Sequence, residues 1–340
     1  MAQPKTTIWD LEPHTSAKHE ILRRYLQAWA PILSQGRFPH LVIVDGFAGP
    51  GRYSKGEEGS PIIAIKAVIE QSRPIGAKVD YHFIELDSRR AEHLASEIAM
   101  LTVPPNVTTT IHSGRSFQDT FPEVWRSYDP KPGRSRPPTF VFIDPFGFKI
   151  PFSYVEEVLR ASSCEVLVNF MFEEINRFLA QEQQPDNFDE LFGCSDWREG
   201  IEIKEPAQRV KFLHDLYTRQ LRQAAGARFV RSFAMRNERN TMDYFLFFAT
   251  NNELGIKKMK EAMWRVDLIL QKFGGRDATV KDVEQFVVCE TPFRETHHKK
   301  VLKELEEAGG MAAIDPPAKR RRGQFGDPGM MLRFKPAAGS

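Results

Sequence analysis

The sequence predicts an α/β protein built on an open, largely parallel β-sheet with helices on both faces, followed by a small second domain. Short apolar runs alternate with amphipathic helical segments, several of these runs end in an acidic residue, and a glycine-rich loop follows the first run. Ligands bind outside the carboxyl ends of the strands in such sheets. We therefore expect the acidic residues and the loop to form a binding site.

The length, composition, net charge and cysteine positions limit the class of protein. The chain has 340 residues, of which 41% are hydrophobic, enough for one large domain and a small one. The net charge of +2 gives no overall attraction for nucleic acid, so such contacts must come from local clusters. The separated cysteines Cys164, Cys194 and Cys289 argue against a zinc module and favour a reducing cytoplasm. With no signal-peptide core and no run of roughly 20 apolar residues, we expect a cytoplasmic protein without a membrane span.

The first half of the chain alternates strands and helices. Helical spacing of apolar residues predicts a helix over 16–33, and the run LVIV predicts a buried parallel strand that ends at Asp45. After the loop, Ser60 is expected to cap a helix whose first residue is Pro61. The order then continues with predicted strands at 79–87, 107–114, 139–143 and 165–170, and predicted helices at 88–101 and 116–128.

The second half is expected to complete the sheet and add a domain. Residues 178–226 are polar and helical in tendency, which indicates an insertion or lid, and a strand pair at 228–236 and 242–252 follows. A helix at 254–273 closes a first domain of residues 1–275. Residues 276–340 then show two helices, 280–288 and 294–310, and two short strands, 311–314 and 330–335, joined by a basic loop, which is the outline of a winged helix-turn-helix.

The glycine-rich loop DGFAGPG begins at Asp45 and lets the backbone approach a ligand at Gly46, Gly49 and Gly51. It lacks the lysine and Ser/Thr of a P-loop, which argues against nucleoside triphosphate hydrolysis. A dinucleotide fingerprint places its acid roughly 20 residues beyond the glycines, whereas Glu85 lies about 40 residues beyond Asp45. A ligand with a nucleoside but no pyrophosphate suits this loop better.

Three motifs carry a resemblance to known families. Asp45 with Phe47 in FAGPG resembles the first motif of class I methyltransferases, and Glu85 in FIELD matches the acid that holds ribose hydroxyls in that fold. Asp144 in FIDPFG sits where amino-methyltransferases place a D-P-P-Y-type motif. The loop also resembles that of a bacterial ribosomal-RNA adenine-N6 methyltransferase, whose N-terminal helix carries a lysine-histidine pair like Lys18-His19.

The whole set of motifs is similar to the three-Cys-motif partner protein family over nearly the whole chain. The motifs are KHEILRRYLQAW, VDGFAGPGRYSKGEEGSP, FIELD, FIDPFGFK and NFMFEEINRF. This resemblance implies a methyltransferase-like Rossmann domain with a C-terminal winged helix, and S-adenosylmethionine as cofactor. It also implies a partner protein that carries a three-cysteine motif and is similar to radical S-adenosylmethionine proteins.

The resemblance assigns roles around Asp144. In D-P-P-Y enzymes the aspartate and a proline carbonyl accept hydrogen bonds from the target amine, and the tyrosine stacks on the base. Here Asp144 and Pro145 remain, while Phe146 or Phe148 is expected to stack on a flipped base. Asp144 alternatively caps the next helix or pairs with Lys149. Lys18 is either an active-site cation or a solvated residue.

Other candidates remain open between two roles. Arg115 and Ser116 follow the third strand, where methyltransferases contact adenine, but they also suit a surface loop. Asp87 competes with Glu85 as ribose ligand. Asn169 ends the fifth strand, and a substrate-facing role and a structural hydrogen bond explain it equally well.

Basic residues of the second domain are candidates for contact with nucleic acid or a partner protein, since each phosphate neutralised steepens the salt dependence by roughly 0.9. A merely solvated face is the alternative. The residues are Lys299, Lys300, Arg320, Arg321 and Arg322.

Taken together, the sequence predicts an S-adenosylmethionine-dependent methyltransferase that acts on nucleic acid, working with the three-Cys-motif partner and without a metal. The alternative is a non-catalytic scaffold of the same fold that binds nucleic acid or recruits the partner. A nuclease is disfavoured, because the acids Asp45, Glu85 and Asp144 belong to separate strand ends and form no two-metal pattern.

Overall fold

A computed structural model describes residues 6–11, 13–36, 38–179, 185–236, 242–273, 275–290, 296–307, 311–314, 316 and 320–334. The contacts divide the chain into two compact units, Met1–Ala262 and Met263–Ser340. No helix within these ranges is long and apolar enough to cross a membrane.

A seven-stranded sheet lies at the centre of the first unit, and its strand order is β3-β2-β1-β4-β5-β7-β6. Its strands are β1 His40–Asp45, β2 Lys78–Glu85, β3 Val107–Ser113, β4 Thr139–Ile143, β5 Glu165–Phe170, β6 Phe229–Arg236 and β7 Met242–Thr250. The first five pair in parallel, whereas β7 runs antiparallel to both β5 and β6. This is an open, mostly parallel sheet of an α/β fold, so the predicted α/β class is confirmed, and the strand order reverses at β1 beside β4.

Helices cover both faces of this sheet. They are α1 Pro13–Gln35, α2 Ser60–Ile69, α3 Ser88–Ala99, α4 Phe117–Ser127 and α5 Phe152–Arg160. A further helix, α10 Glu253–Phe273, begins in this unit and continues past its last residue, Ala262. On one face Tyr25 and Trp29 of α1 pack on Phe140 of β4. On the other, α4 and α5 join a core with the apolar side chains of β1, β4 and β5. The strand ends are thereby held between two packed layers.

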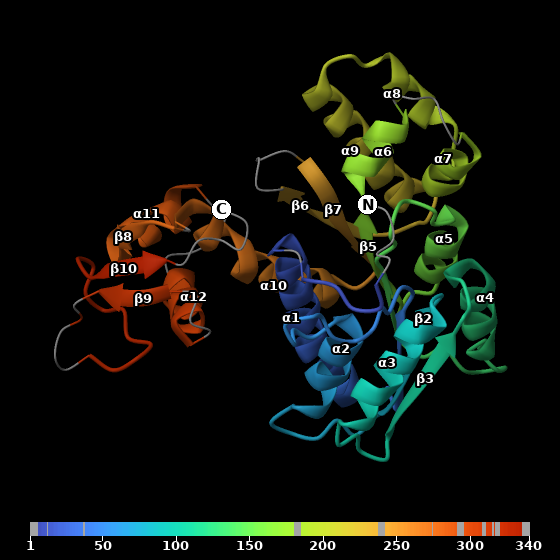
Figure 1. Cartoon of the computed structure of the whole chain (residues 1–340), viewed down its shortest axis with the longest axis horizontal. Coiled ribbons are helices and arrows are strands. Elements are labelled where there is room, and N and C mark those ends of the chain that lie inside the picture. The colour runs from blue at the N-terminus through green and yellow to red at the C-terminus, as the bar shows by residue number, and fades with distance from the viewer. Residues whose placement is uncertain are drawn as a thin grey trace. The chain divides into compact units, whose positions relative to one another are not determined.

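A helical insertion stands between β5 and β6, as the sequence predicts. Its elements are α6 Phe172–Leu179, α7 Pro185–Phe192, the short 3-10 helix η1 Asp196–Arg198, α8 Glu199–Glu202 and α9 Pro206–Gln223. These helices gather in one part of the unit (Figure 1). Buried aromatic residues join them to the sheet core, among them Phe188, Phe192 and Tyr217.

Two local predictions need correction. Gly59, not Ser60, occupies the N-cap of α2, and no side chain caps this helix, so Ser60 is its first residue. The sequence analysis also did not anticipate α5. Helix α1 contains Pro31 and ends at Gln35, close to the predicted end at residue 33.

Three antiparallel strands and two helices form the described part of the second unit. They are β8 Asp277–Thr279, α11 Val280–Glu290, α12 Thr296–Glu307, β9 Met311–Ile314 and β10 Met331–Phe334. The sheet order is β8-β10-β9, and the apolar faces enclose a core around Leu302, Leu332 and Phe334. Both predicted helices and both predicted strands are present, whereas the short strand β8 was not predicted.

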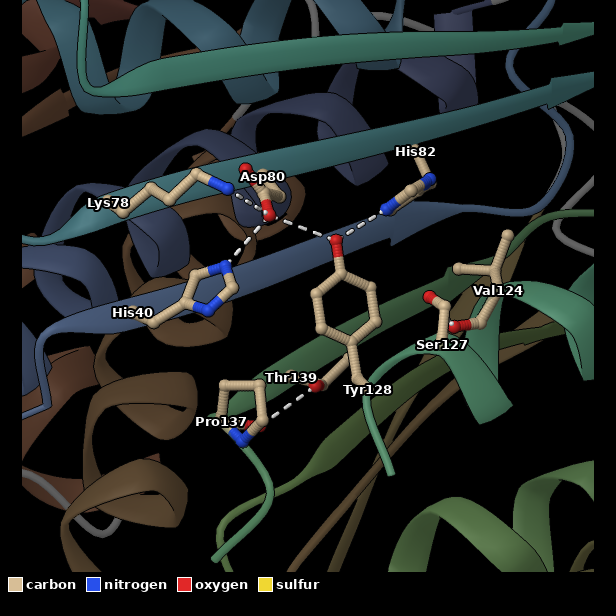
Figure 2. Close-up of polar contacts among 9 residues, drawn as sticks. All are labelled: His40, Lys78, Asp80, His82, Val124, Ser127, Tyr128, Pro137 and Thr139. Atoms are coloured by element: carbon tan, nitrogen blue, oxygen red, sulfur yellow. Dashed lines mark hydrogen bonds and ion pairs between the residues drawn. The ribbon is translucent and has the colours of Figure 1, made fainter. Parts of the chain in front are cut away.

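A polar network fixes the C-terminal end of α4 on the sheet (Figure 2). The hydroxyl of Tyr128 lies 3.0 Å from Asp80 Oδ2 and 2.7 Å from His82 Nε2. His40 Nε2 lies 2.8 Å from the same Asp80 oxygen, and His82 Nδ1 lies 3.0 Å from His112 Nε2. We call His40, Asp80, His82, His112 and Tyr128 the histidine network. It joins β1, β2 and β3 to the helix that begins beside the glycine-rich loop.

Candidate functional site

A pocket of about 200 Å³ opens where the glycine-rich loop meets the ends of β4 and β5. Five parts of the first unit supply its lining: the N-terminal segment, α1, the loop, the ends of β4 and β5, and β7. The lining residues are Trp9, Thr15, Lys18, His19, Phe47, Ala48, Gly49, Pro50, Gly51, Arg52, Tyr53, Gly59, Ser60, Asp144, Pro145, Phe146, Asn169, Met171 and Tyr244. The predicted loop and the D-P-F motif therefore share one cavity.

Backbone hydrogen bonds fold the loop onto the strand ends. Gly46 N donates to Phe142 O at 2.9 Å, and Ala48 N donates to Ile84 O at 2.9 Å. A Cβ on Gly46 would lie 2.7 Å from the ring of Phe117, so this position has no space for a side chain. Gly49 and Gly51 have φ values of 66° and 81°, a region that favours glycine. The loop thus presents bare backbone to the pocket at Gly49 and Gly51.

Asp45 ends β1 beneath this loop with an incomplete set of hydrogen bonds. Its Oδ1 accepts from Phe47 N at 3.2 Å, but its buried Oδ2 has no hydrogen-bond partner among the described residues. Burial raises the pKa of Asp45 to about 7, against the lowering effects of the Ser60 hydroxyl and the Phe47 amide. A buried acceptor of this kind is costly unless a donor reaches it.

Glu85 ends β2 and holds the glycine-rich loop by accepting a backbone hydrogen bond from it. Its Oε2 accepts from Gly49 N at 2.8 Å, its Oε1 accepts from Asp87 N at 2.8 Å, and burial raises its pKa. Asp87 instead caps α3 by accepting from Arg89 N, and its ion pair with Arg89 lowers its pKa to about 2. Asp45, Gly46 and Glu85 support the pocket from behind and are not part of the lining given above.

Asp144 lies at the end of β4 and makes two charged or polar contacts. Its Oδ2 is 2.5 Å from Lys18 Nζ of α1, and its Oδ1 accepts from Asn169 Nδ2 at 2.6 Å. The structure therefore pairs Asp144 with Lys18, where the sequence had offered Lys149 or a helix cap. The Lys18 side chain is only 7% exposed, and its ammonium lies 5.5 Å from the ring centroid of Tyr244. Lys18 is thus a buried pocket residue and not a solvated one.

His19, the neighbour of Lys18, also lines the pocket. Burial, with the Lys18 charge as a second cause, lowers the pKa of its imidazole to about 3. His19 is therefore neutral at physiological pH.

Aromatic side chains form another part of the pocket. Phe146 is 41% exposed and makes an edge contact with Trp9, with ring centroids 5.7 Å apart. Trp9 also contacts Tyr53 at 5.7 Å and lies under the guanidinium of Arg90 at 4.9 Å. Phe148, the alternative stacking residue, is buried and stacks on Phe188 of the insertion. Phe146 is therefore the one of these two that a ligand can reach.

Arg115 and Ser116 do not line the pocket. The guanidinium of Arg115 forms a bidentate ion pair with the exposed Glu123, and Ser116 caps α4 by accepting from Asp119 N at 3.1 Å. Both contacts hold the start of α4. Sequence reasoning missed Trp9, Tyr53 and Tyr244 as pocket residues, and only the isolated tryptophan in a polar N-terminal segment gave a signal.

The basic residues of the second unit differ in availability. Arg320 pairs with Glu306 at 2.8 Å, its side chain is only 9% exposed, and it lies over the ring of Phe325. Arg322 donates to Glu306 O at 2.7 Å. Arg321 and Lys299 are exposed, and the Lys300 side chain lies outside the described residues. Glu306 therefore holds two of the predicted cations within the unit.

Comparisons with known proteins give fold-level likenesses alone. No family model matches the chain, and no curated protein matches it. An O-methyltransferase from Bacillus cereus in complex with SAH is 15% identical, with 67% of this chain and 80% of that chain covered and a TM-score of 0.36. A Legionella pneumophila protein is 12% identical, with 72% and 90% covered and a TM-score of 0.40. A geranyl diphosphate methyltransferase in complex with GPP and sinefungin is 13% identical, with 70% and 78% covered and a TM-score of 0.34. Values this low assign neither substrate nor activity.

Proposed function

We propose that the chain is an S-adenosylmethionine-dependent methyltransferase whose cofactor binds against the glycine-rich loop. The observation that carries this proposal is the glycine-rich loop, which lines the pocket with bare backbone at Gly49 and Gly51 above the buried acids Asp45 and Glu85. In this proposal the ammonium group of the cofactor lies towards Asp45, and its ribose hydroxyls lie towards Glu85. Gly49 and Gly51 line the pocket at the end of a parallel strand, where such folds bind nucleosides.

The charges around the pocket also suit a cationic cofactor. Three carboxylates, Asp45, Glu85 and Asp144, stand at neighbouring strand ends, and Lys18 pairs with one of them. When bound, the cofactor supplies an electrophilic methyl group. The protein's own part is to hold the acceptor in line with that group and to provide a fixed electrostatic environment.

For the acceptor, we propose an amine of a nucleic-acid base. Phe146 offers an exposed aromatic ring beside Asp144 and Pro145, and stacking on such a ring tolerates any base because every base has a π-face. Lys18 Nζ lies 2.5 Å from Asp144 Oδ2, and Asn169 donates to Asp144 Oδ1, so these polar groups line the same pocket as the ring of Phe146.

The second unit is proposed to be a winged helix that contacts nucleic acid. Its order of strand, two helices and two antiparallel strands supports this, and Arg321 and Lys299 offer exposed charge. We further propose that the chain works with a three-Cys-motif partner protein. The free thiols of Cys164 and Cys194 agree with a reducing cytoplasm as its location.

A non-catalytic scaffold is the second candidate, and one observation favours it. Both oxygens of Asp144 already hold donors, from Lys18 and Asn169, and Phe146-Gly147 stand where amine methyltransferases have proline and tyrosine. In this case the pocket would serve recognition, and the chain would recruit the partner without methyl transfer.

Calorimetric titration with S-adenosylmethionine and S-adenosylhomocysteine tests the cofactor proposal. Binding should be present in the intact chain and lost in Asp45→Ala and Glu85→Ala. Asp80→Ala is the matched control, because Asp80 is a buried acid on the same strand as Glu85 but belongs to the histidine network. Absence of binding in the intact chain would favour the scaffold, or a site that the partner completes. Turnover on mixed nucleic acid, with and without the partner, then separates enzyme from scaffold.

A further inference from the structure

Asn169 is one of the polar residues that line the pocket, and it is hydrogen-bonded to Asp144. It is the penultimate residue of β5, its side chain is 3% exposed, and it lines the pocket together with Met171 and Asp144. Its Nδ2 donates to Asp144 Oδ1 at 2.6 Å and lies 3.2 Å from the sulfur of Met171. A buried amide in an otherwise apolar strand is expected to satisfy both of its ends.

The contact with Asp144 fixes which way the amide points. A carboxylate only accepts hydrogen bonds, so the group of Asn169 that faces it must be the NH₂. The ammonium of Lys18, which can only donate, lies 2.5 Å from the other oxygen of Asp144. The Oδ1 of Asn169 is therefore oriented away from Asp144 as an acceptor, and it is buried without a hydrogen-bond partner in the described structure.

We infer that Asn169 Oδ1 receives an N–H of the methyl acceptor, and that the acceptor is a primary amine on a flat aromatic ring. This inference rests on the proposed function and deepens it. Asp144 has a donor on each oxygen, so its part is to position the Asn169 amide and not to receive the amine itself. Asn169 takes no proton; it orients the nitrogen by accepting a hydrogen bond.

The flat ring is indicated by the surroundings of Asn169. Phe146 lines the same pocket with an exposed ring, and Trp9 stands at its edge. A site built to receive an N–H discriminates strongly against an analogue that lacks it, because its own acceptor is then left unpaired. The amine, more than the ring, should therefore decide binding.

Pairs of nucleosides that differ only in the amine test the inference. The full chain, saturated with S-adenosylhomocysteine, is titrated by calorimetry with adenosine and purine riboside, and with cytidine and pyrimidin-2-one riboside. In at least one pair the amine should bind about tenfold more tightly or better, within the range expected for a satisfied against an unsatisfied acceptor. Asn169→Leu should remove this preference while binding of S-adenosylhomocysteine is unchanged.

Two further variants separate binding from folding. Asn169→Asp keeps an acceptor oxygen and should keep the preference, more strongly as the pH falls, because a proton shared with Asp144 replaces the amide N–H. Asn106→Leu is the control: Asn106 donates to Ile75 O and Ala77 O, both at 2.8 Å, and lies outside the pocket lining. It should lower the melting temperature and leave the preference intact.

The outcomes distinguish this inference from the proposed function. If the intact chain does not bind S-adenosylhomocysteine, the cofactor proposal is overturned. If that binding is present, the assignment of Asn169 is overturned by equal binding of both members of each pair, undetectable binding included, or by a preference that persists in Asn169→Leu.

Discussion

Lys18 of α1 lies 2.5 Å from Asp144 at the end of β4, Nζ to Oδ2. The contact joins the first helix of the chain to the strand end that carries the D-P-F motif. Both side chains are largely shielded, at 7% and 18% exposure. Removal of one partner of such a pair leaves an uncompensated charge, which costs more than the pair contributes.

Lys18→Met should lower methyl transfer at least about 100-fold, because Asp144 then loses the cation that fixes it and no longer holds the Asn169 amide in a defined orientation. Single-turnover transfer from labelled S-adenosylmethionine measures this. Lys66→Met is the matched control, since Lys66 of α2 pairs with Glu58 at 2.6 Å outside the pocket lining. Undiminished transfer in Lys18→Met would remove Lys18 from the site.

Gly51→Ala should destabilise the first unit more than Gly56→Ala does. Both glycines have positive φ, 81° and 89°, which costs an alanine roughly 1–2 kcal/mol at either position. A Cβ on Gly51 would also lie 2.7 Å from the Leu94 side chain, whereas Gly56 has open space around it. Overpacking adds about 1–3 kcal/mol. Urea unfolding of both variants checks the difference, and equal losses would contradict the close contact.

The stability that His82 contributes to the first unit should be lost as the pH falls from about 6.5 towards 4. Burial and the neighbouring His112 lower the pKa of His82 to about 4, while an unfolded histidine takes up a proton near 6.5. At this residue the unfolded chain therefore binds more protons in this range, so the His82 contribution favours unfolding in acid. His82→Gln should flatten the profile of melting temperature against pH in this window.

Tyr128→Phe provides the comparison for that profile. It removes the hydroxyl that joins His82 to Asp80 but leaves the titrating imidazole in place. We expect a loss of about 1 kcal/mol that changes little between pH 7 and 8. A profile for His82→Gln as steep as that of the intact chain would show that His82 is not the group that titrates. His19, whose pKa is also lowered, would then be the next candidate.

Substitution of Arg321 should affect nucleic-acid binding, whereas substitution of Arg320 should affect stability. Arg321→Ala should weaken nucleic-acid binding and reduce the salt slope by about 0.9 without a change in stability, because Arg321 is exposed. Arg320→Ala should instead destabilise the second unit, because it leaves Glu306 without its main partner. Binding at several salt concentrations, with thermal unfolding, measures both. The reverse pattern would contradict this division of roles.

The sequence predicts the strand ends well because apolar runs that stop at an acid describe buried parallel strands and their carboxyl edge. Asp45, Glu85 and Asp144 accordingly lie at the ends of β1, β2 and β4. The glycine-rich loop was equally readable, since only special backbone angles or close approach explain so many glycines.

Contacts between residues that are far apart in the sequence could not be predicted from it. Asp144 contacts Lys18 and not the nearby Lys149, because α1 packs across the sheet and brings its first turns to the end of β4. For Arg115 the sequence left a contact with adenine and a surface loop open, and the structure pairs this residue with Glu123 of the following helix. The histidine network likewise joins three strands whose register no local pattern reveals.

The pocket draws its lining from Trp9 to Tyr244, which is nearly the whole length of the first unit. Trp9, the first lining residue along the chain, is synthesised long before β7, which supplies the last one, Tyr244. A shortened chain that stops before β7 therefore contains the loop and the D-P-F motif but not a complete cavity. Ligand binding should therefore report that the first unit is complete and correctly folded. A bound ligand should protect the segments around Trp9 and Tyr244 from proteolysis together.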